Sequence, residues 1–364
     1  MSDLAALWRY VADTSCRGYS PLYDRICRTV AEREEVLDLV SEAPPRGHNP
    51  LLLLAAVHYL LLDGLDHPLA AVYAAGDEPE AGAGTGTDAD PGALFVDVCL
   101  QHRDQILGLL ATERVNTNEV GRSAVIGPAL TLVSQRLGVP LGHVDVGCSA
   151  GLNLLGDRYR MDYGSRGVTG PADAAVELHC EVLAGRPPIA EARPAIAARF
   201  GLDLAPTDVH DPHQFRWQLA CVWPDTGRLA RTRRALEEAR RHPLTLVPGD
   251  AVEQVGQVIA ELPDDAVAVV TTTWVVGYFS LEQRAGFQEA LAIASIAGSR
   301  PVAWISAESQ GVVAAIPSDG PPSDDLGVEC SVLGLVTYDD GLVVPELLGY
   351  THPHGQTLDW RATG

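Results

Sequence analysis

The sequence contains no lysine, and all 26 of the basic residues among its 364 positions are arginine. Schiff-base chemistry with pyridoxal phosphate or with a carbonyl substrate needs a lysine amine, so these mechanisms are excluded. A phosphate-binding loop of the G-x-x-x-x-G-K-[ST] type and a kinase-type lysine are excluded for the same reason. Any cofactor must therefore be held by backbone turns, carboxylates and arginine.

Positive charge is scarce relative to negative charge, because 48 Asp and Glu residues give a formal net charge of −22. Such a chain repels phosphate backbones, and we find no local basic patch, so we expect no nucleic-acid partner. Long apolar runs are also missing. The longest, Leu51–Leu62, is interrupted by His58 and is shorter than the roughly 20 residues that span a bilayer. We therefore expect no membrane partner.

The cysteine pattern lacks any C-x-x-C pair, and the seven cysteines are scattered along the chain. This favours reduced thiols over disulfides or a zinc site. The first ten residues lack the basic start and apolar stretch of a signal peptide. We expect a cytoplasmic protein without a metal, which acts on a small-molecule substrate as a monomer or homodimer.

Helical apolar spacing dominates residues 1–138, which we predict to form an all-helical N-terminal cap or lid domain. Pro21 and Pro50 lie where a first helical turn tolerates proline. We predict the acidic, glycine-rich segment Gly76–Gly92 to be a surface loop. The predicted helices are Leu4–Cys16, Leu22–Val40, Pro50–Leu62, Ala93–Leu110 and Asn118–Leu137.

Strands alternate with helices in residues 139–364, which is typical of an α/β fold with a parallel, doubly wound sheet. Two β-rich runs joined by Asp339-Asp340-Gly341 predict an antiparallel C-terminal hairpin. Residues 156–199 are less regular, and we predict an insertion there over the sheet's carboxyl edge. The predicted strands are Leu141–Val146, Phe200–Leu204, Leu244–Val247, Ala266–Thr272, Val302–Ser306, Cys330–Thr337 and Leu342–Tyr350, and the predicted helices are Pro212–Cys221, Gly227–Arg241, Val252–Leu262 and Leu281–Ala297.

The most informative segment is HVDVGCSAGLNLL, residues 143–155, in which a strand enters a glycine-containing turn and a helix is predicted from Leu152. Gly147 and Gly151 let backbone N–H groups approach a ligand, and Asp145 stands at the carboxyl end of the strand. Here the sequence resembles the class I S-adenosylmethionine (SAM)-dependent methyltransferases, whose first motif reads Asp/Glu-x-Gly-x-Gly-x-Gly. The chain departs from that motif at Ser149, where the family usually has glycine.

This resemblance implies a Rossmann-like domain that binds SAM. It further implies that the segments after the first strand hold the methionine portion of SAM and that Asp203 holds the ribose. Asp250 and Ala251 would lie beside the adenine. The other positions that the resemblance assigns to cofactor binding are Asp145, Gly147, Ser149, Gly151 and Asn153, and those that it assigns to substrate are Thr272, Trp274 and Tyr278.

The segment TNEVGR, residues 117–122, precedes a helix that leads into the first strand, so it can lie across the predicted cleft. Arg122 is suited to bind a carboxylate, and Asn118 or Glu119 to bind an amine, as the amino-acid end of SAM or an amino-acid substrate requires. The alternative is a capped surface helix with a Glu–Arg pair. The full-length chain also resembles a bacterial family of unknown function, through residues 53–59, 117–122 and 147–154.

Because lysine is missing, the base must be His58, Glu119, Tyr278 or the substrate itself, and Tyr59 beside His58 is a candidate substrate contact. The alternative for His58 and Tyr59 is a satisfied core pair. Asp208, His210, Asp211 and His213 form a polar cluster that we interpret as a loop before a helix capped by Asp211.

The expected activity is methyl transfer from SAM to a small molecule. One alternative is reaction at the aminocarboxypropyl arm of SAM, by transfer or by cyclisation to a small-ring amino acid with release of methylthioadenosine. Another is a serine hydrolase, because Gly147–Gly151 also reads G-x-S-x-G, with Ser149 as the nucleophile and His352 or His354 as the base. A non-enzymatic binding protein with the same fold also remains open.

Overall fold

The computed structural model describes residues 2–76, 90–137, 140–189, 193–320 and 330–362. The chain divides into two compact units, one of residues 1–117 and 208–233 and one of residues 118–207 and 234–364. We call the first the helical unit and the second the sheet unit. This division differs from the predicted one at 138/139, because the helix before the first strand belongs to the sheet unit and residues 208–233 belong to the helical unit.

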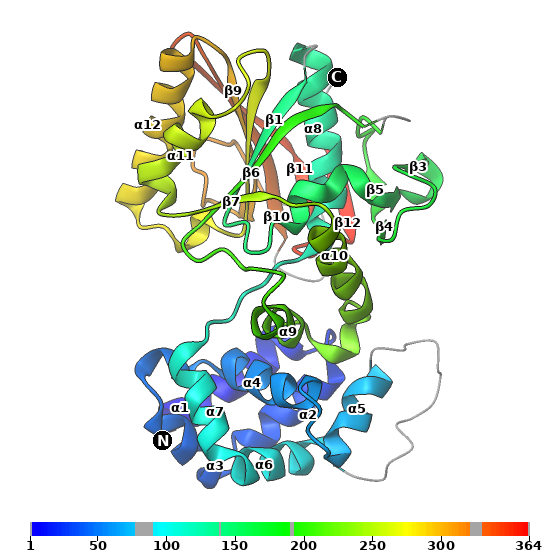
Figure 1. The fold of residues 1–364 in the computed structure, drawn as a ribbon, viewed down its shortest axis with the longest axis vertical. Helices are drawn as coiled ribbons and strands as arrows, with labels where there is room; N and C mark the ends of the chain where they lie inside the picture. The colour runs from blue at the N-terminus through cyan, green and yellow to red at the C-terminus, as the bar shows by residue number, and fades with distance from the viewer. Residues whose placement is uncertain (1, 77–89, 138–139, 190–192, 321–329, 363–364) are drawn as a thin grey trace. The chain divides into compact units, whose positions relative to one another are not determined.

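The helical unit is built from α-helices with short 3-10 and π-helical turns (Figure 1). Its elements are α1 (Ser2–Val11), η1 (Ala12–Cys16), α2 (Pro21–Val30), α3 (Glu34–Glu42), η2 (Pro45–His48), α4 (Pro50–Leu62), α5 (Pro68–Gly76), α6 (Pro91–Gln101), α7 (Arg103–Thr112), α9 (Pro212–Ala220) and η7 (Pro224–Thr226). The long helices predicted over Leu22–Val40 and Ala93–Leu110 are each two helices, and α5 was not predicted. The predicted loop at 76–92 falls mostly outside the described residues.

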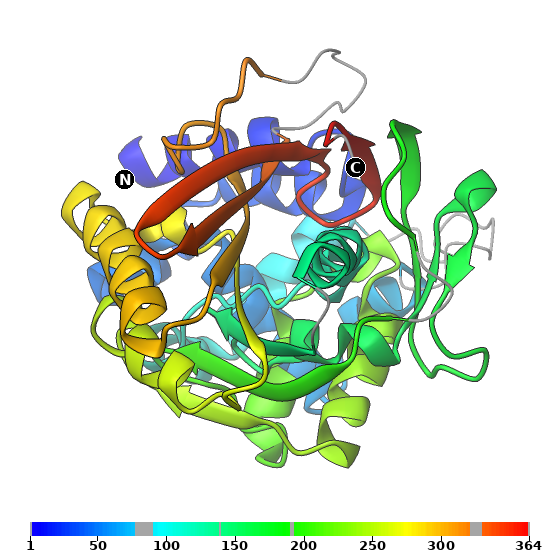
Figure 2. The same cartoon turned by 90° about the horizontal axis from the view of Figure 1, so that it is seen from above.

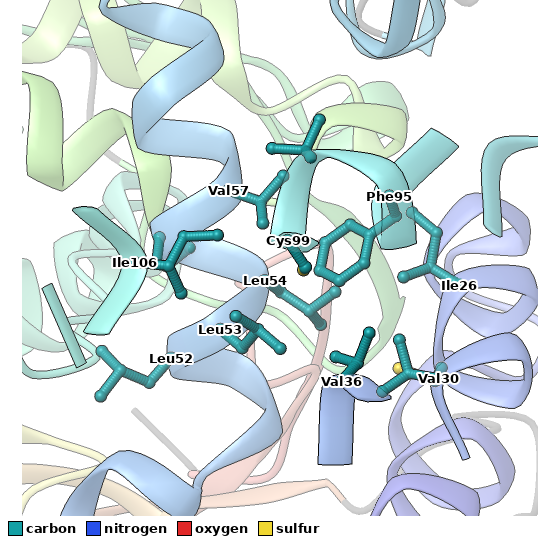
Figure 3. Close-up of a cluster of buried hydrophobic side chains, with 14 of the residues drawn as sticks. Ile26, Val30, Val36, Leu52, Leu53, Leu54, Val57, Phe95, Cys99 and Ile106 are labelled. Atoms are coloured by element: carbon teal, nitrogen blue, oxygen red, sulfur yellow. The ribbon is translucent and has the colours of Figure 1, made fainter. Parts of the chain in front are cut away.

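The core of the helical unit forms around α4, whose bounds match the prediction. The Asn49 side chain accepts a hydrogen bond from the Leu51 N–H at 3.0 Å, and Pro50 occupies the first turn. This helix is apolar on all sides, and a helix of that kind must be buried on all sides. Side chains of α2, α3, α6 and α7 accordingly surround Leu53 and Leu54 (Figure 3).

Polar side chains tie α9 to α4, which explains why residues 208–233 belong to the helical unit. The Tyr59 hydroxyl lies 2.8 Å from His213 Nδ1 and accepts a hydrogen bond from Arg216 Nη1 at 3.0 Å. His213 Nε2 lies 2.9 Å from Glu113 Oε1, and Arg216 pairs with Asp63 at 2.9 Å. We call these five residues the α4–α9 network.

The central sheet of the sheet unit has, over the described residues, the strand order β5-β12-β11-β10-β9-β8-β1-β6-β7. The pairs from β9 to β7 are parallel, and those from β9 to β12 are antiparallel. Its strands are β1 (Leu141–Val146), β5 (Glu181–Ala184), β6 (Ile196–Asp203), β7 (Thr245–Pro248), β8 (Val267–Thr273), β9 (Val302–Ser309), β10 (Ser331–Asp339), β11 (Leu342–Thr351) and β12 (Thr357–Trp360).

Helices cover both faces of the parallel strands, which is why β1 and β8 are buried along their whole length (Figure 1). The helices α11 (Ala251–Ala260) and α12 (Leu281–Gly298) pack on the face that carries Val144 and Val146. The helix α8 (Ser123–Leu137) packs on the opposite face. The helix α10 (Leu229–Arg241) leads into β7, and the division between the two units falls within it.

The C-terminal hairpin is antiparallel, as predicted. Asp340 and Gly341 connect β10 to β11, and both have positive φ (46° and 80°), as a type I′ turn requires. The hairpin extends toward α12, where the Ser295 hydroxyl donates to the Tyr338 carbonyl at 3.0 Å (Figure 2). The predicted α/β class with a mostly parallel sheet is therefore confirmed.

The connection from β1 to β6 differs from the predicted helix that begins at Leu152. It starts with the short 3-10 helix η5 (Leu152–Arg158), because Gly151 is left-handed and no α-helix begins there. The predicted insertion then forms a small sheet of order β3-β2-β4 and supplies β5, which pairs with β12. The elements of the insertion are β2 (Arg160–Asp162), η6 (Gly164–Arg166), β3 (Val168–Thr169) and β4 (Glu177–His179).

Candidate functional site

The carboxyl edge of the parallel strands contains a switch point between β1 and β8. From β1 the chain proceeds outward to β6 and β7, and it then crosses to β8 and β9 on the other side of β1. In open α/β sheets the crevice outside the carboxyl ends of the strands at such a point is where ligands bind. The candidate site is therefore the set of loops that follow β1, β6, β8 and β9.

The loop after β1 alternates left-handed residues, with φ of 71° at Gly147, 51° at Ser149 and 71° at Gly151. Gly147 also has no room for a side chain, because a Cβ there would lie 2.2 Å from a methyl group of Val275. A non-glycine residue in this conformation is uncommon and costs free energy, so Ser149 is held in place by its surroundings.

Asp203 fixes this turn from the end of β6. Its Oδ2 accepts the Ser149 N–H at 2.9 Å, and its Oδ1 accepts the Ala205 N–H at 2.9 Å. Each carboxylate oxygen has capacity for a further hydrogen bond. The ribose contact predicted for Asp203 stays a prediction, and the role that the structure adds is to join the loops after β1 and β6.

Asp145 is a buried carboxyl group at the carboxyl end of β1. Thr271 donates a hydrogen bond to its Oδ1 at 2.8 Å, and the same hydroxyl lies 2.9 Å from His143 Nε2. Burial raises the pKa of the Asp145 carboxyl to about 7, and the charge of Asp203 adds to this effect while Thr271 and Arg122 oppose it. A carboxyl group of this kind changes its charge near neutral pH, as groups at functional sites often do.

The segment 118–122 lies against this edge within the sheet unit. The Asn118 amide donates to the Cys148 carbonyl at 3.4 Å. Arg122 is buried, and its guanidinium donates to the carbonyls of Thr273 at 3.0 Å and Pro353 at 2.9 Å. Glu119 accepts the Gly121 N–H at 2.8 Å and lies 3.5 Å from His354 Nδ1. Arg122 therefore brings a positive charge to a region rich in carboxylates.

Glu308, at the end of β9, is a further carboxyl group at this edge of the sheet, and the sequence analysis did not indicate it. It is 2% exposed, and its Oε1 accepts the N–H groups of Val275 and Val276 at 3.0 and 3.1 Å. Burial raises the pKa of its carboxyl, while these hydrogen bonds and the charge of Arg122 oppose the change. A glutamate at the end of an apolar strand is the signal that would have found it.

The residues at the end of β8 and directly after it are divided between buried and exposed positions. Thr272 is fully buried and accepts the Trp304 indole N–H at 3.0 Å. Trp274 has a φ of 59°, and its indole N–H donates to the Ser331 hydroxyl at 2.7 Å. Tyr278 is 87% exposed, and its predicted role as a base stays a prediction.

Two further predicted cofactor residues have local partners. Asp250 caps α11, since its Oδ1 accepts the Val252 N–H at 2.8 Å, and Ala251 is the first residue of that helix. Asn153 accepts a hydrogen bond from the Ser123 hydroxyl at 2.7 Å. Their predicted contacts with a cofactor stay predictions.

His58 and Tyr59 belong to the helical unit and make their contacts there. His58 is 1% exposed, its Nδ1 lies 3.1 Å from the Ala220 carbonyl, and its ring packs against Tyr73. Burial lowers the pKa of His58 to about 4. Tyr59 is part of the α4–α9 network. This is the arrangement of a satisfied core pair. Asp211 caps α9, as predicted, by accepting the His213 N–H at 2.8 Å.

The fold and its polar edge define an α/β protein with a mostly parallel central sheet. The chain belongs to a bacterial family, since the family model described as "Uncharacterized protein conserved in bacteria (DUF2332)" matches residues 5–360. This confirms the resemblance to a bacterial family of unknown function. No curated protein and no solved structure gives a significant match.

Two further findings concern membrane-spanning helices and metal-binding groups. No helix within the described residues is long and apolar enough to cross a membrane. In the same part of the chain, no group of three or more His, Cys, Asp or Glu side chains has a geometry that could hold a metal ion.

Proposed function

We propose that the protein is a SAM-dependent transferase that acts on a small molecule, and that methyl transfer is its reaction. The observation that carries this proposal is the combination of strand order and turn at the carboxyl edge. Numbered along the chain, the parallel strands β1, β6, β7, β8 and β9 lie in the order 3-2-1-4-5, which is that of the Rossmann-like dinucleotide-binding fold. The turn of left-handed residues 147, 149 and 151 follows the central strand.

The turn suits a nucleoside cofactor because its left-handed residues hold backbone groups at the switch point. Gly147 and Gly151 carry no Cβ, and Asp203 anchors the backbone between them through the Ser149 N–H. In this proposal the turn contacts the methionine portion, Asp203 the ribose, and Asp250 with Ala251 the adenine. This reproduces the assignment that the resemblance to class I methyltransferases implies.

The electrostatics of the edge suit a cationic cofactor. Asp145, Asp203 and Glu308 place carboxyl groups there, and the charge of Arg122 acts on Asp145 and Glu308. SAM, when bound, supplies an alkyl group that its sulfonium charge has already activated. The protein's own part is to align the acceptor, to exclude water and to accept or hold a proton. Asp145 is suited to hold that proton, because burial raises the pKa of its carboxyl to about 7.

The reaction at the aminocarboxypropyl arm of SAM is the alternative for the same site. Incubation of the full chain with SAM, followed by mass analysis of the nucleoside product, separates the two. S-adenosylhomocysteine indicates methyl transfer, and methylthioadenosine indicates that the arm has reacted. We expect S-adenosylhomocysteine in the presence of a suitable acceptor.

Calorimetric titration tests binding without any acceptor. We expect SAM and S-adenosylhomocysteine to bind, and Asp203→Ala to weaken both, because the turn at Ser149 loses its anchor. Asp264→Ala is the matched control, since Asp264 is exposed and lies outside the edge. If neither nucleoside binds the wild-type protein, the proposal is wrong.

A serine hydrolase is the second candidate, and the left-handed conformation of Ser149 in a strand–turn favours it. The Ser149 hydroxyl lies 3.4 Å from Thr207 Oγ1, whereas a hydrolase needs a histidine at that position. Substitution Ser149→Ala decides the matter, since a hydrolase would lose nearly all its activity and a SAM-dependent enzyme would keep it.

A further inference from the structure

Three buried polar side chains form a hydrogen-bonded chain across β1 and β8. The Thr271 hydroxyl donates to Asp145 Oδ1 at 2.8 Å, and the same oxygen lies 2.9 Å from His143 Nε2. A third partner of this hydroxyl, the Val144 carbonyl, lies farther away, at 3.5 Å. Asp145, Thr271 and His143 are each at most 2% exposed. The proposed function uses Asp145 alone and leaves the other two side chains without a role.

The geometry of the sheet places these side chains in one row. His143 and Asp145 are two residues apart on β1, so their side chains point to the same face of the sheet. Asp145 stands beside Thr271 in the parallel register of β1 and β8. Val144 and Val146 point to the opposite face, where α11 and α12 pack. The sheet itself therefore fixes the row, which does not depend on the conformation of a loop.

The His143 end of the row borders a small hollow against α8. The hollow has a volume of about 20 Å³, and roughly 10–15 Å³ is enough for one water molecule. Ser123 and Asn153 line it beside His143, and the half-buried residues Asp157 and Pro194 belong to the same lining. The row therefore joins the carboxyl edge of the sheet to a hollow with room for water.

The Thr271 hydroxyl determines the direction of both hydrogen bonds in the row, because it has one proton to donate. When Asp145 is ionised, Thr271 donates to it and accepts from His143, whose proton is then on Nε2. When Asp145 is protonated, its carboxyl group donates to Thr271, which donates in turn to Nε2 of His143. The proton of His143 is then on Nδ1. The protonation state of Asp145 therefore determines the tautomer of His143.

We propose that Thr271 and His143 are positioning residues that pass a proton between Asp145 and the hollow on the α8 face. When Asp145 loses its proton, the Thr271 oxygen receives it, and Thr271 gives its own proton to His143 Nε2. His143 releases its Nδ1 proton to a water molecule. Thr271 and His143 each end with as many protons as before, and water holds the proton that Asp145 has lost. The inference rests on the proposed function only for the source of that proton, which is the acceptor molecule.

The surroundings of His143 favour passing a proton on over keeping it. Burial lowers the pKa of His143 to about 3, and the charge of Arg199, which stands beside it on β6, adds to this effect. Arg199 itself pairs with Asp157. A histidine with so low a pKa is neutral at every pH at which Asp145 changes its charge, so it changes its tautomer and not its charge.

The surroundings of Asp145 place its change of charge near neutral pH. Burial raises the pKa of its carboxyl to about 7, the hydrogen bond from Thr271 and the charge of Arg122 oppose this, and the charge of Asp203 adds to it. The titratable group on the turn after β1 is the Cys148 thiol, whose pKa burial raises, so it is neutral in this range. Asp145 is therefore the member of the row that titrates.

Nitrogen NMR of the full chain with 15N-labelled histidine tests the coupling, because the two tautomers and the charged form differ in the protonation of the two ring nitrogens. We expect the His143 signals to change from the Nδ1–H to the Nε2–H pattern as pH rises, with a midpoint near 7. We expect no charged form of His143 in this range. His143→Gln assigns the signals, and Asp145→Asn, which cannot ionise, should abolish the change.

Variants at Thr271 separate proton transfer from packing. Thr271→Val removes the hydroxyl and should make the His143 tautomer independent of pH, whereas Thr271→Ser keeps a hydroxyl and should retain the change. Thr131→Val is the matched control at another buried threonine, whose hydroxyl donates to the Gly127 carbonyl, and it should behave as the wild type does. Thermal melting checks that each variant is folded. If Thr271→Val is unfolded, Thr271→Ser and Asp145→Asn decide the result.

Thr271→Val should also raise the proton affinity of Asp145 about tenfold, because the ionised carboxylate loses the stronger, charge-assisted hydrogen bond. The midpoint for Asp145 should therefore rise by about one pH unit. Denaturant unfolding of Thr271→Val with and without Asp145→Asn, at a series of pH values, measures this midpoint. A midpoint that stays the same or falls would contradict the role of Thr271.

The outcomes also distinguish this inference from the proposed function. The inference is overturned if the wild-type His143 tautomer is the same from pH 5 to pH 9, if it changes equally in Asp145→Asn, or if His143 becomes charged near pH 7. The proposed function is tested separately, by calorimetry with SAM. Coupled titration of His143 in a protein that does not bind SAM supports the proton path and contradicts the SAM site. SAM binding with an uncoupled His143 leaves the proposed function standing alone.

Discussion

The α4–α9 network and the carboxyl edge of the sheet both bring polar groups together, but they pair them differently. In the network each acid faces a cation or a histidine, with Glu113 against His213 and Asp63 against Arg216. At the edge, Asp145 and Glu308 have raised pKa values and are both influenced by the charge of Arg122. Matched pairing joins secondary-structure elements, whereas carboxyl groups with raised pKa values at a switch point are a feature that functional sites often share.

The largest effect in this comparison is expected at Arg122. Arg122→Met removes a buried cation bonded to the carbonyls of Thr273 and Pro353, and it leaves the carboxyl groups nearby without its charge. We expect a loss of about 3–5 kcal/mol in the free energy of unfolding, because two hydrogen bonds from a charged group are lost and each contributes about 1.5–3 kcal/mol. Denaturant unfolding measures it.

Arg136→Met is the control for this prediction, since Arg136 pairs with Glu346 at 2.6 Å on the surface. Exposed pairs contribute about 0–1 kcal/mol. If Arg122→Met and Arg136→Met lose equal free energies of unfolding, the stability of the edge does not depend on the charge of Arg122.

The second prediction concerns the pH dependence that Asp145 gives to the sheet unit. The folded-state pKa of Asp145, about 7, lies above its ordinary value of 3.8. The folded protein therefore binds this proton more tightly than the unfolded chain does, and stability falls as pH rises from about 4 to about 7. At 1.36 kcal/mol per pKa unit the total contribution is about 4 kcal/mol.

Asp145→Asn removes this contribution, so the variant should gain stability relative to the wild type as pH rises from 5 to 8. Denaturant unfolding at a series of pH values measures the difference. If the stability difference between Asp145→Asn and the wild type does not change from pH 5 to pH 8, then Asp145 is ionised throughout this range. The carboxyl groups of the edge would then be as well paired as those of the α4–α9 network.

The third prediction has the opposite sign and concerns His58. Burial lowers its folded-state pKa to about 4 from 6.5, so its contribution to stability is fully present above pH 6.5 and is lost as pH falls toward 4. The shift corresponds to about 3 kcal/mol. His58→Gln should therefore reduce the loss of stability between pH 6.5 and pH 4, and the exposed residue His210, changed to Gln, is the control. If the stability of the wild type and that of His58→Gln fall equally between pH 6.5 and pH 4, this prediction is wrong.

The elements that the sequence predicted best are those whose local signals agree with their tertiary surroundings. Proline and asparagine mark the start of α4, and an uninterrupted apolar run gives its length, so its bounds were predicted in full. The strand β1 was predicted equally well because it is buried on both faces. The break between α2 and α3 was missed because residues 31–33, Ala-Glu-Arg, contain neither glycine nor proline.

The candidate site could be predicted from the sequence only where its residues lie in a strand or directly after one. The turn 147–151 and Asp203 follow strands and carry glycine or acid, so the sequence indicated them. Glu308 stands at the end of an apolar strand, but its partners Val275 and Val276 follow a different strand, β8, and no local pattern encodes that pairing. For His58 and Tyr59 the sequence left two interpretations, a site pair and a core pair, and their partners on α9, more than 150 positions away, favour the core pair.

The smallest expected effect tests that structural role. Tyr59→Phe removes the hydroxyl that contacts His213 and accepts a hydrogen bond from Arg216, and it keeps the ring against Trp217. We expect a loss of about 1–2 kcal/mol, because two polar groups lose a partner but both are partly exposed and can bind water. Tyr10→Phe, at a side chain that is 63% exposed, is the matched control and should change stability little. A loss in Tyr59→Phe no larger than in Tyr10→Phe would mean that the network does not hold α9 to α4, and the role in substrate binding predicted for Tyr59 would again be the better interpretation.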